Sequence, residues 1–325
     1  MLNIEDWSNL PLSDRNGTYG GMAGAKRGVI YNNEPWMIKL PKRIKRVDVS
    51  ELSYTTSPLS EYIGSQIYSA LGFDTHETKL SEYEGKIAAA CKDFRKNNEM
   101  LLVIWTIKNA VNEELAKILE KDFSGSAPSH LINLDELLLH IDYNDILNSV
   151  KGLKERFWDC VVVDTLINNN DRNDENWGIL RCNGRDRLAP IFGNGASFSD
   201  NLSENMIEDY MQNPEKIRNS ALNTATAFHI NGKPVCVRFL FEDYENSDFK
   251  AAVMRNIPLI ENNMEEICKI IDNIPEIHNG KLVCSKQRAE FYKIGMIYRM
   301  NELMVRCYNR IRKCDFSAGG WMENG

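Results

Sequence analysis

The first part of the chain alternates short apolar runs with turns, as β-strands do. Residues 28–40 (GVIYNNEPWMIKL) predict two strands joined by a turn at 32–35, because Asn and Pro favour turns between apolar runs. Ser57 and Pro58 predict the start of a helix, whose apolar residues recur at helical spacing as far as Gly72. Residues 77–83 and 86–94 predict two more strands.

The rest of the chain has helical periodicity. Apolar residues recur every three or four positions over 112–121, 134–140, 153–167, 259–274 and 285–313. This spacing gives each segment one buried helix face. A short apolar stretch at 189–192 predicts a single strand.

The pattern changes near residues 93–98, so we predict an α+β fold of two lobes. A small β-rich N-lobe carrying one helix precedes a larger, mainly helical C-lobe. The expected parts are residues 1–95, 96–316 and a disordered tail at 317–325.

Charge and cysteine usage narrow the function classes. The 325 residues carry a net charge of −7, which argues against direct nucleic-acid binding, since such proteins usually have a basic excess. No apolar run is long enough to span a membrane, and the N-terminus lacks a signal sequence. The eight cysteines are scattered without a C-x-x-C pair, as buried thiols are in a reducing compartment. We therefore expect a cytoplasmic protein with no membrane partner, although export without a leader sequence would leave no mark here.

A polar loop between two apolar runs carries the clearest candidate chemistry. Residues 168–178 (NNNDRNDENWG) place Asp171 and Asn176 five positions apart. In phosphoryl transfer, a carboxylate orients the attacking hydroxyl and accepts its proton, and an amide oxygen on the same loop binds a metal ion. Asp171 is therefore the candidate base and Asn176 the candidate metal ligand. Taken alone, the pattern is also that of an ordinary Asn-rich turn.

Three features upstream of this loop strengthen the interpretation. A glycine-rich segment precedes the first long strand, and glycine lets backbone N–H groups approach phosphate oxygens closely. Lys39 lies between apolar residues of the next strand, where a lysine needs an anionic partner. Glu61 on the following helix is the obvious partner. The same order of parts is found in protein kinases. The members of the candidate phosphate loop are Gly20, Gly21, Met22, Ala23, Gly24, Ala25 and Lys26.

Together with AAACKDF and APIFGNGASF, these stretches resemble the HipA-like serine/threonine protein kinases in their short, CtkA-like form. The resemblance implies a protein-kinase-like fold, ATP and Mg²⁺ as cofactors, and transfer of phosphate to a protein hydroxyl. It makes Asp171 the catalytic aspartate, Asn176 the metal-binding asparagine, and Lys39 the phosphate-binding lysine paired with Glu61. Residues 91–94 would form the hinge that holds adenine. The hinge positions expected to contact ATP are Lys92, Asp93 and Phe94.

Three residues depart from the family pattern. Asn168 and Asn173 stand where the family has glycine and histidine, which would change the shape of the loop more than its chemistry. Gly193 stands where the family has the aspartate that is the main metal ligand. Losing that carboxylate removes several kcal/mol of charge stabilisation, or about a hundredfold to several thousandfold in rate. We therefore expect an impaired kinase, unless Asn194 or Asp200 supplies the ligand.

The rest of the site is intact, which favours a single inactivating substitution at Gly193. The alternatives are a nucleotide-binding pseudokinase scaffold and a small-molecule phosphotransferase. The resemblance also implies a bacterial toxin-type kinase that autophosphorylates, with Thr18 and Tyr19 as candidate sites. About 20 residues precede the phosphate loop, too few for the N-terminal subdomain of HipA. This argues against a HipB-like antitoxin partner, and the protein substrate stays open.

Overall fold

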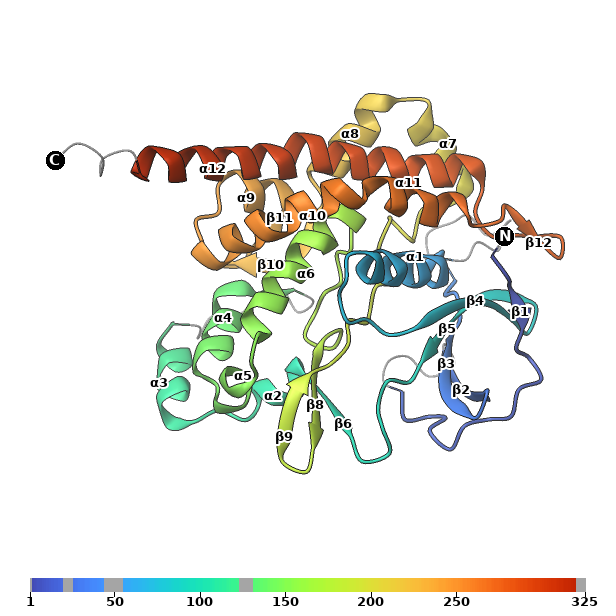
Figure 1. Ribbon diagram of the computed structural model, residues 1–325, viewed down its shortest axis with the longest axis horizontal. Coiled ribbons are helices and arrows are strands. Elements are labelled where there is room, and N and C mark those ends of the chain that lie inside the picture. Colours follow the sequence, from blue (N-terminus) through green and yellow to red (C-terminus); the bar gives the residue numbers. More distant parts are fainter. Residues whose placement is uncertain (1, 20–25, 44–54, 123–130, 320–325) are drawn as a thin grey trace.

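The computed structural model describes residues 2–19, 26–43, 55–122 and 131–319, with side chains omitted at 121–122 and 315–319. It has an N-terminal β-sheet and a larger, mainly helical part (Figure 1). The predicted α+β class is therefore confirmed. The boundaries predicted for the lobes stay predictions. Within the predicted tail, residues 317–319 continue the last helix, and 320–325 lie outside the described residues.

The N-terminal sheet has five strands in the order β1-β4-β5-β3-β2. β1 and β4 are parallel, and the other neighbours are antiparallel. Asn32 and Asn33 both have positive φ, as a two-residue turn between β2 and β3 requires. Trp7, Tyr31 and Trp36 pack against one another on one side of the sheet. The strands are β1 (Glu5–Asp6), β2 (Lys26–Tyr31), β3 (Glu34–Lys39), β4 (Thr78–Tyr83) and β5 (Lys86–Lys92).

Helix α1 (Ser57–Ala70) joins the sheet to the helical part. Its apolar residues belong to the same buried core as the C-terminal helices, whereas the sheet has a second, smaller core. Tyr68 donates a hydrogen bond to the Asp164 carboxylate on α6 (Leu153–Ile167), with an O–O distance of 2.8 Å. Glu61 on α1 is thereby fixed relative to the loop that follows α6, which carries Asp171.

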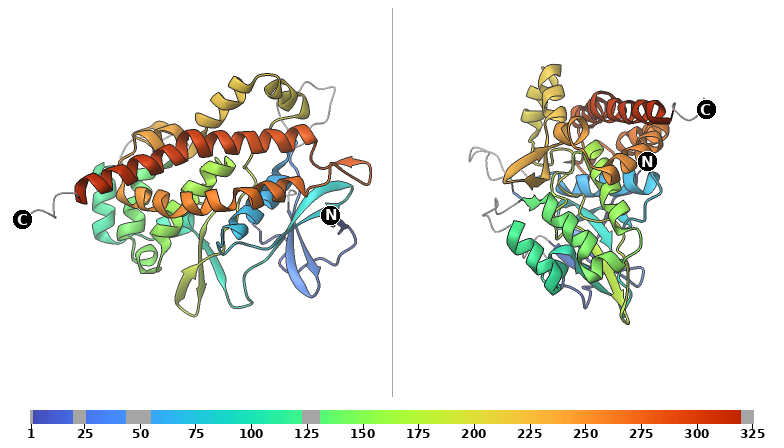
Figure 2. Two further views of the ribbon diagram at one scale, coloured as in Figure 1. Left: turned by 45° about the horizontal axis from the view of Figure 1, so that its top comes forward. Right: turned by 90° about the vertical axis from the view of Figure 1, so that its left-hand side faces the viewer.

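Most helices lie in the C-terminal two thirds of the chain. Figure 2 shows that α11 and α12, the last two α-helices, run along one side of the molecule. They are α2 (Ile104–Lys108), α3 (Glu113–Asp122), α4 (Leu134–Tyr143), α5 (Asp145–Ser149), α7 (Glu204–Met211), α8 (Pro214–Leu222), α9 (Val237–Glu242), α10 (Ser247–Asp272), α11 (Lys286–Arg299), the π-helical η1 (Met300–Met304) and α12 (Val305–Gly319).

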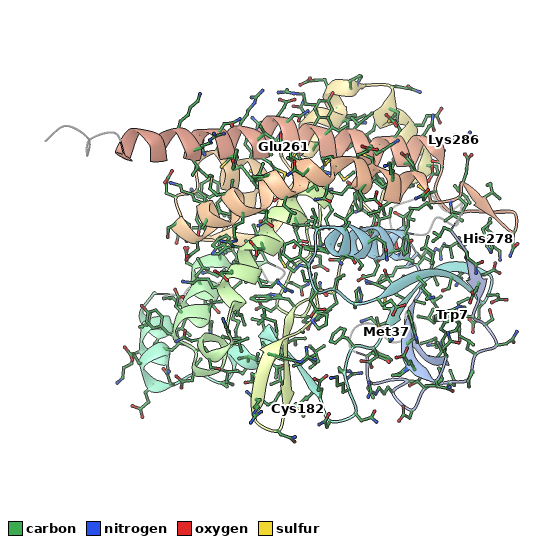
Figure 3. The ribbon with its side chains drawn as sticks, in the orientation of Figure 1. Trp7, Met37, Cys182, Glu261, His278 and Lys286 are labelled. Atoms are coloured by element: carbon green, nitrogen blue, oxygen red, sulfur yellow. The ribbon has the colours of Figure 1, made fainter. Side chains whose placement is uncertain are left out.

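Three small sheets accompany the helices. The sheet β6-β8-β9 flanks the loop that carries Asp171 and Asn176, because β8 begins directly after that loop. Figure 3 places Met37 on the N-terminal sheet and Cys182 at the free end of the β8–β9 hairpin. The strands are β6 (Met100–Val103), β8 (Gly178–Cys182) and β9 (Arg185–Leu188), then β7 (Ile132–Asn133), β10 (Ala225–Ile230) and β11 (Lys233–Cys236), and finally β12 (Ile277–His278) and β13 (Lys281–Leu282).

Several elements differ from the sequence-based expectation. The helix predicted at 259–274 begins earlier, at Ser247, and contains Pro258. The helix predicted at 285–313 is interrupted by the π-helical turn η1. The stretch 189–192 forms only an isolated bridge between Ile191 and Thr75. Across the described residues, no helix is both long enough and apolar enough to span a membrane.

Candidate active site

A cleft between the N-terminal sheet and the helical part brings most of the predicted site residues together. Its volume is about 610 Å³, within the range of small-molecule sites. Lys39 and Glu61 line it from the sheet and α1, and Asp171, Asn176 and Gly193 line it from two loops of the helical part. Lys39 and Asp171, which are more than 100 positions apart in the sequence, therefore line the same cleft.

Lys39 and Glu61 form an ion pair in which Glu61 is buried and the Lys39 side chain is 19% exposed. Lys39 ends β3, and Glu61 lies in the second turn of α1 with a side chain that is 2% exposed. Burial opposes the charged form of Lys39, but Glu61 outweighs it and raises the pKa of this lysine. Burial also opposes ionisation of Glu61, yet Lys39 and His76 hold the pKa of its carboxyl well below the usual range. Both groups are therefore charged at neutral pH.

The second oxygen of Glu61 connects this pair to the loop at Gly193. Oε1 accepts hydrogen bonds from the backbone N–H groups of Gly193 and Asn194, each at 3.1 Å. It also lies 3.2 Å from Nε2 of the buried His76. Glu61 therefore connects Lys39, the candidate phosphate-binding lysine, to the loop at Gly193. Sequence reasoning did not find His76, which lies outside any motif.

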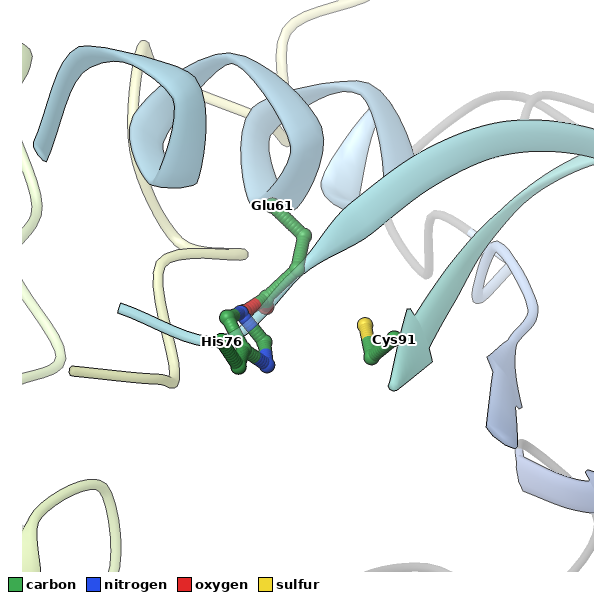
Figure 4. Close-up of side chains that lie close together, drawn as sticks. All are labelled: Glu61, His76 and Cys91. Atoms are coloured by element: carbon green, nitrogen blue, oxygen red, sulfur yellow. The ribbon is translucent and has the colours of Figure 1, made fainter. Parts of the chain in front are cut away.

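Glu61, His76 and Cys91 form a compact buried group (Figure 4), with their potential metal-binding atoms within 4.8 Å of one another. The Glu61 carboxylate already interacts with Lys39, His76 and two backbone N–H groups. Burial raises the pKa of the Cys91 thiol far above its usual value, so the sulfur is a protonated, poor ligand. This group is better explained as the packing around the ion pair than as a metal site.

Asp171 and Asn176 lie on the loop between α6 and β8. The Asp171 side chain is exposed to the cleft, and its Oδ1 accepts a hydrogen bond of 2.6 Å from Asn173 Nδ2. Asn176 Nδ2 donates to Asp171 Oδ2 at 3.2 Å and to its backbone carbonyl. The two asparagine amides thus orient the carboxylate of the candidate base. Asn173, which departs from the family pattern, takes part in this orientation.

Arg172 is the structural centre of the loop that carries Asp171 and Asn176. Its buried guanidinium forms two hydrogen bonds with the Asp164 carboxylate, at 2.7 and 2.8 Å. It also donates to the backbone carbonyls of Asn176 and Phe192 and to Asn194 Oδ1. One side chain therefore ties together α6, this loop and the Gly193 loop. Sequence reasoning overlooked this residue.

Gly193 contributes no side-chain ligand and leaves little space for one. Its φ is +77°, and an added Cβ would lie 2.8 Å from Asn176 Cβ and 3.0 Å from Asn176 Oδ1. The Asn176 amide oxygen therefore faces the position where the family has an aspartate. The neighbouring Asn194 is fully buried and bonded to Arg172 and Ser65. Asn194 is thus excluded as a replacement ligand.

Comparisons with known proteins agree with this geometry. No protein-family model matches the chain. The serine/threonine-protein kinase CtkA of Helicobacter pylori strain J99 is 33% identical over 267 residues, 80% of this chain and 77% of that protein. The chain belongs to the HipA-like serine/threonine protein kinases.

Two solved structures resemble the chain. The crystal structure of the H. pylori proinflammatory kinase CtkA matches with a TM-score of 0.81 at 29% identity, covering 96% of this chain and 99% of that one. HipA of Shewanella oneidensis, solved with HipB and operator DNA, matches with a TM-score of 0.51 at 11% identity. That alignment covers 93% of this chain and 68% of that one, and it shows a shared fold.

The residues of the predicted hinge, Cys91 to Phe94, all line the cleft. Cys91 and Lys92 belong to β5, in the middle of the sheet, and the Lys92 side chain pairs with Glu34 and Glu77. The Asp93 N–H donates to the Pro35 carbonyl at 3.0 Å. Phe94 lies beyond the end of β5, and its ring contacts that of Phe192 at a ring-centroid distance of 5.7 Å. The contacts of Lys92, Asp93 and Phe94 with ATP therefore stay a prediction.

Most of the candidate phosphate loop lies outside the described residues. The members outside them are Gly20, Gly21, Met22, Ala23, Gly24 and Ala25. Lys26 begins β2, stands opposite Lys39 in the strand register, and lines the cleft. Burial and the charge of Lys39 lower the pKa of Lys26. Two lysines on adjacent strands thus face the space where phosphates would lie.

Gly195 packs directly against the Lys39–Glu61 pair. An added Cβ would overlap Lys39 Nζ and lie 2.7 Å from Ser57 Oγ and 3.0 Å from Glu61 Oε2. Overpacking of this kind costs about 1–3 kcal/mol. We expect Gly195→Ala to lower ADP affinity by about fivefold to a hundredfold, measured by calorimetry. Gly232→Ala, which adds a methyl group in open space, should leave ADP affinity unchanged, and equal losses in both variants would contradict this prediction.

Proposed function

We propose that the protein is an ATP-dependent protein kinase that transfers the γ-phosphoryl group to a serine or threonine hydroxyl of a polypeptide. The observation that carries the proposal is the convergence of Lys39, Glu61, Asp171 and Asn176 on one cleft. Family membership supports the kinase assignment. A cleft of about 610 Å³ has space for a nucleotide and a reacting side chain.

The residues have distinct parts in this reaction. Lys39, held by Glu61, would bind phosphate oxygens, and Asp171 would orient the acceptor hydroxyl and receive its proton. The bond from the γ-phosphorus to the bridging oxygen breaks as the bond to the hydroxyl oxygen forms. The leaving ADP retains the electron pair of the broken bond. Positioning and charge supply most of the rate acceleration in such transfers.

Asn176 would be a ligand of the magnesium ion that accompanies ATP. Mg²⁺ prefers oxygen ligands, usually one or two carboxylates with phosphates and waters, and Asn176 offers an amide oxygen at the cleft. When bound, the ion neutralises charge that develops on the phosphates. Gly193 offers no carboxylate, so we further propose that the rate lies below that of an enzyme with aspartate at this position.

The test is transfer of label from γ-labelled ATP to the protein itself and to a generic serine-rich acceptor protein. We expect incorporation into serine or threonine that depends on Asp171. Labelled sites located by mass spectrometry would show whether the kinase modifies itself, with Thr18 as the candidate. Binding of ATP without transfer, in the wild type and in Gly193→Asp, would instead favour a pseudokinase scaffold. Transfer to small alcohols and not to proteins would favour a small-molecule phosphotransferase.

Gly193→Asp is expected to raise the transfer rate by between about tenfold and a thousandfold, because it restores a carboxylate worth several kcal/mol to the ion. Aspartate tolerates positive φ better than most residues, but Asn176 must move to make space. Gly193→Asn has the same shape without the charge and is the matched control. Equal rates in the two variants would show that charge at this position is unimportant.

A further inference from the structure

A divalent ion bound with the nucleotide would find few side-chain oxygen ligands near Gly193. Among the residues at the Gly193 loop, Gly193 has no side chain and Asn194 is buried and fully engaged. Asn176 supplies a neutral oxygen. A magnesium ion with nucleotide phosphates is usually bound by one or two carboxylates in addition. The question is which carboxylate of this chain lies near enough to serve.

Asp200 is the candidate carboxylate ligand. It lines the cleft together with Lys39, Asp171 and Asn176. Its carboxylate is partly buried, and it interacts with the charges of Lys39, Lys42 and Asp171. Lys39 is the proposed phosphate-binding lysine, and Asp171 is the candidate base. Asp200 therefore faces the region where the transferred phosphate and its ion would lie.

Asp200 also differs from the other buried carboxylates near the cleft. Glu61 pairs with Lys39, Asp93 with Arg95 and Arg15, Asp164 with Arg172, and Asp174 with Lys108. Within the described ranges, no cation lies within ion-pair distance of the Asp200 carboxylate, and no other residue donates a hydrogen bond to it. A partly buried carboxylate is costly without a compensating charge. A bound cation would supply that charge.

The backbone holds Asp200 in this place from two sides. Its carbonyl oxygen accepts hydrogen bonds from Thr56 N at 2.8 Å and Thr56 Oγ1 at 3.2 Å, at the start of the helix that carries Glu61. Two residues earlier, the N–H of Phe198 donates to the carbonyl of Ile167, the last residue of α6. Asp200 is thus anchored to both elements that position the phosphate-transfer residues. Its side chain remains available to the cleft.

We propose, on the basis of the kinase function proposed above, that the Asp200 carboxylate replaces the missing carboxylate of position 193 and holds the divalent ion that accompanies the nucleotide. Asn176 supplies the second side-chain oxygen. Gly193 then lowers the rate without abolishing metal binding, because the ion keeps one carboxylate ligand from a different position of the same loop.

The test measures metal binding rather than turnover. Mn²⁺ is titrated into the protein saturated with ADP, and free Mn²⁺ is read by electron paramagnetic resonance. The variants are Asp200→Asn, Gly193→Asp and the double variant, with Asp209→Asn as a control. Asp209 is an exposed carboxylate on α7, paired with Lys216. Thermal unfolding of each variant checks that the fold is retained.

We expect Asp200→Asn to weaken Mn²⁺ binding by roughly tenfold to a hundredfold, the range seen when a metal site loses a supporting group. In the Gly193→Asp background the same change should cost less than about threefold, because two carboxylates that share one role are not additive. Asp209→Asn should leave Mn²⁺ affinity unchanged. An unaltered Mn²⁺ affinity in Asp200→Asn, with ADP still bound, would overturn the assignment of Asp200 alone.

The failure of the proposed function has a different signature. If the wild-type protein bound no ADP in the presence or absence of Mn²⁺, the kinase assignment itself would be overturned, and Asp200 with it. An equal loss of Mn²⁺ affinity in both backgrounds would show that Asp200 contributes general negative charge, which would overturn its role as the replacement ligand. Loss confined to the Gly193 background supports the proposal.

Discussion

Asp171→Asn is expected to lower phosphoryl transfer by about a hundredfold to ten-thousandfold, the range for losing a general base. Asparagine has the shape of aspartate but does not accept the proton of the attacking hydroxyl. The Asp171 carboxylate is held through both oxygens by Asn173 and Asn176. Asparagine retains one acceptor oxygen, so one of these bonds is lost at a cost of about 1 kcal/mol. That loss is too small to explain a thousandfold change, which corresponds to about 4 kcal/mol.

The measurement is the initial rate of label transfer from γ-labelled ATP, in the wild type and in the Gly193→Asp background. ADP affinity and thermal stability should change little, because Asp171 is exposed and no cation lies within ion-pair distance of it in the described part of the chain. Asp209→Asn is the control for removal of a negative charge elsewhere. Transfer that persists at the wild-type rate in Asp171→Asn would remove this residue from the mechanism.

The sequence was informative where a charged residue interrupts an apolar pattern. Lys39 lies between apolar neighbours in β3 and requires a buried partner, and Glu61 follows at the start of the next amphipathic helix. The structure joins these two residues as expected. Asp171 and Asn176 were found because they share one short loop, whose two ends are fixed by α6 and β8. Local spacing was enough for Asp171 and Asn176, whereas Lys39 and Glu61 were paired from the apolar pattern around the lysine.

Other parts of the site depend on the path of the backbone, which spacing does not reveal. His76 lies between α1 and β4 and reaches Glu61 only because α1 packs over the sheet. The close packing of Gly195 against Lys39 is likewise a tertiary contact. The early start of α10 was missed because Pro258 interrupts the pattern, and proline usually marks the end of a helix. The contacts of His76 and Gly195 follow from long-range packing.

Arg172 could have been found from a different signal. The apolar helix α6 contains Asp164 among valines and other buried residues, and a buried carboxylate requires a cation or several donors. Arg172 is the nearest arginine that follows it in sequence. The motif-based interpretation concentrated on Asp171, one position earlier, and on the groups that touch substrate. A search for the cation that pairs with the buried Asp164 would have identified Arg172.

Arg172→Met is expected to destabilise the fold by about 3–5 kcal/mol, the cost of leaving a buried charge without its partner. Asp164 would lose both of its bonds to the guanidinium, and the carbonyls of Asn176 and Phe192 would lose a donor. The measurement is the free energy of unfolding from denaturant titration followed by tryptophan fluorescence. Arg187→Met is the matched control, because Arg187 pairs with Glu99 at a 48% exposed position and should cost at most about 1 kcal/mol.

The double variant Arg172→Met with Asp164→Leu separates the two roles of the arginine. If Arg172 served only to neutralise Asp164, replacing both by apolar residues would recover most of the stability. Arg172 also donates to Asn194 Oδ1 and to two carbonyls of the active-site loops, and Tyr68 and Asn169 donate to Asp164. We therefore expect the double variant to remain destabilised and to bind ADP more weakly than the wild type. Full recovery of both properties would show that the arginine acts on Asp164 alone and that the loops hold their positions without it.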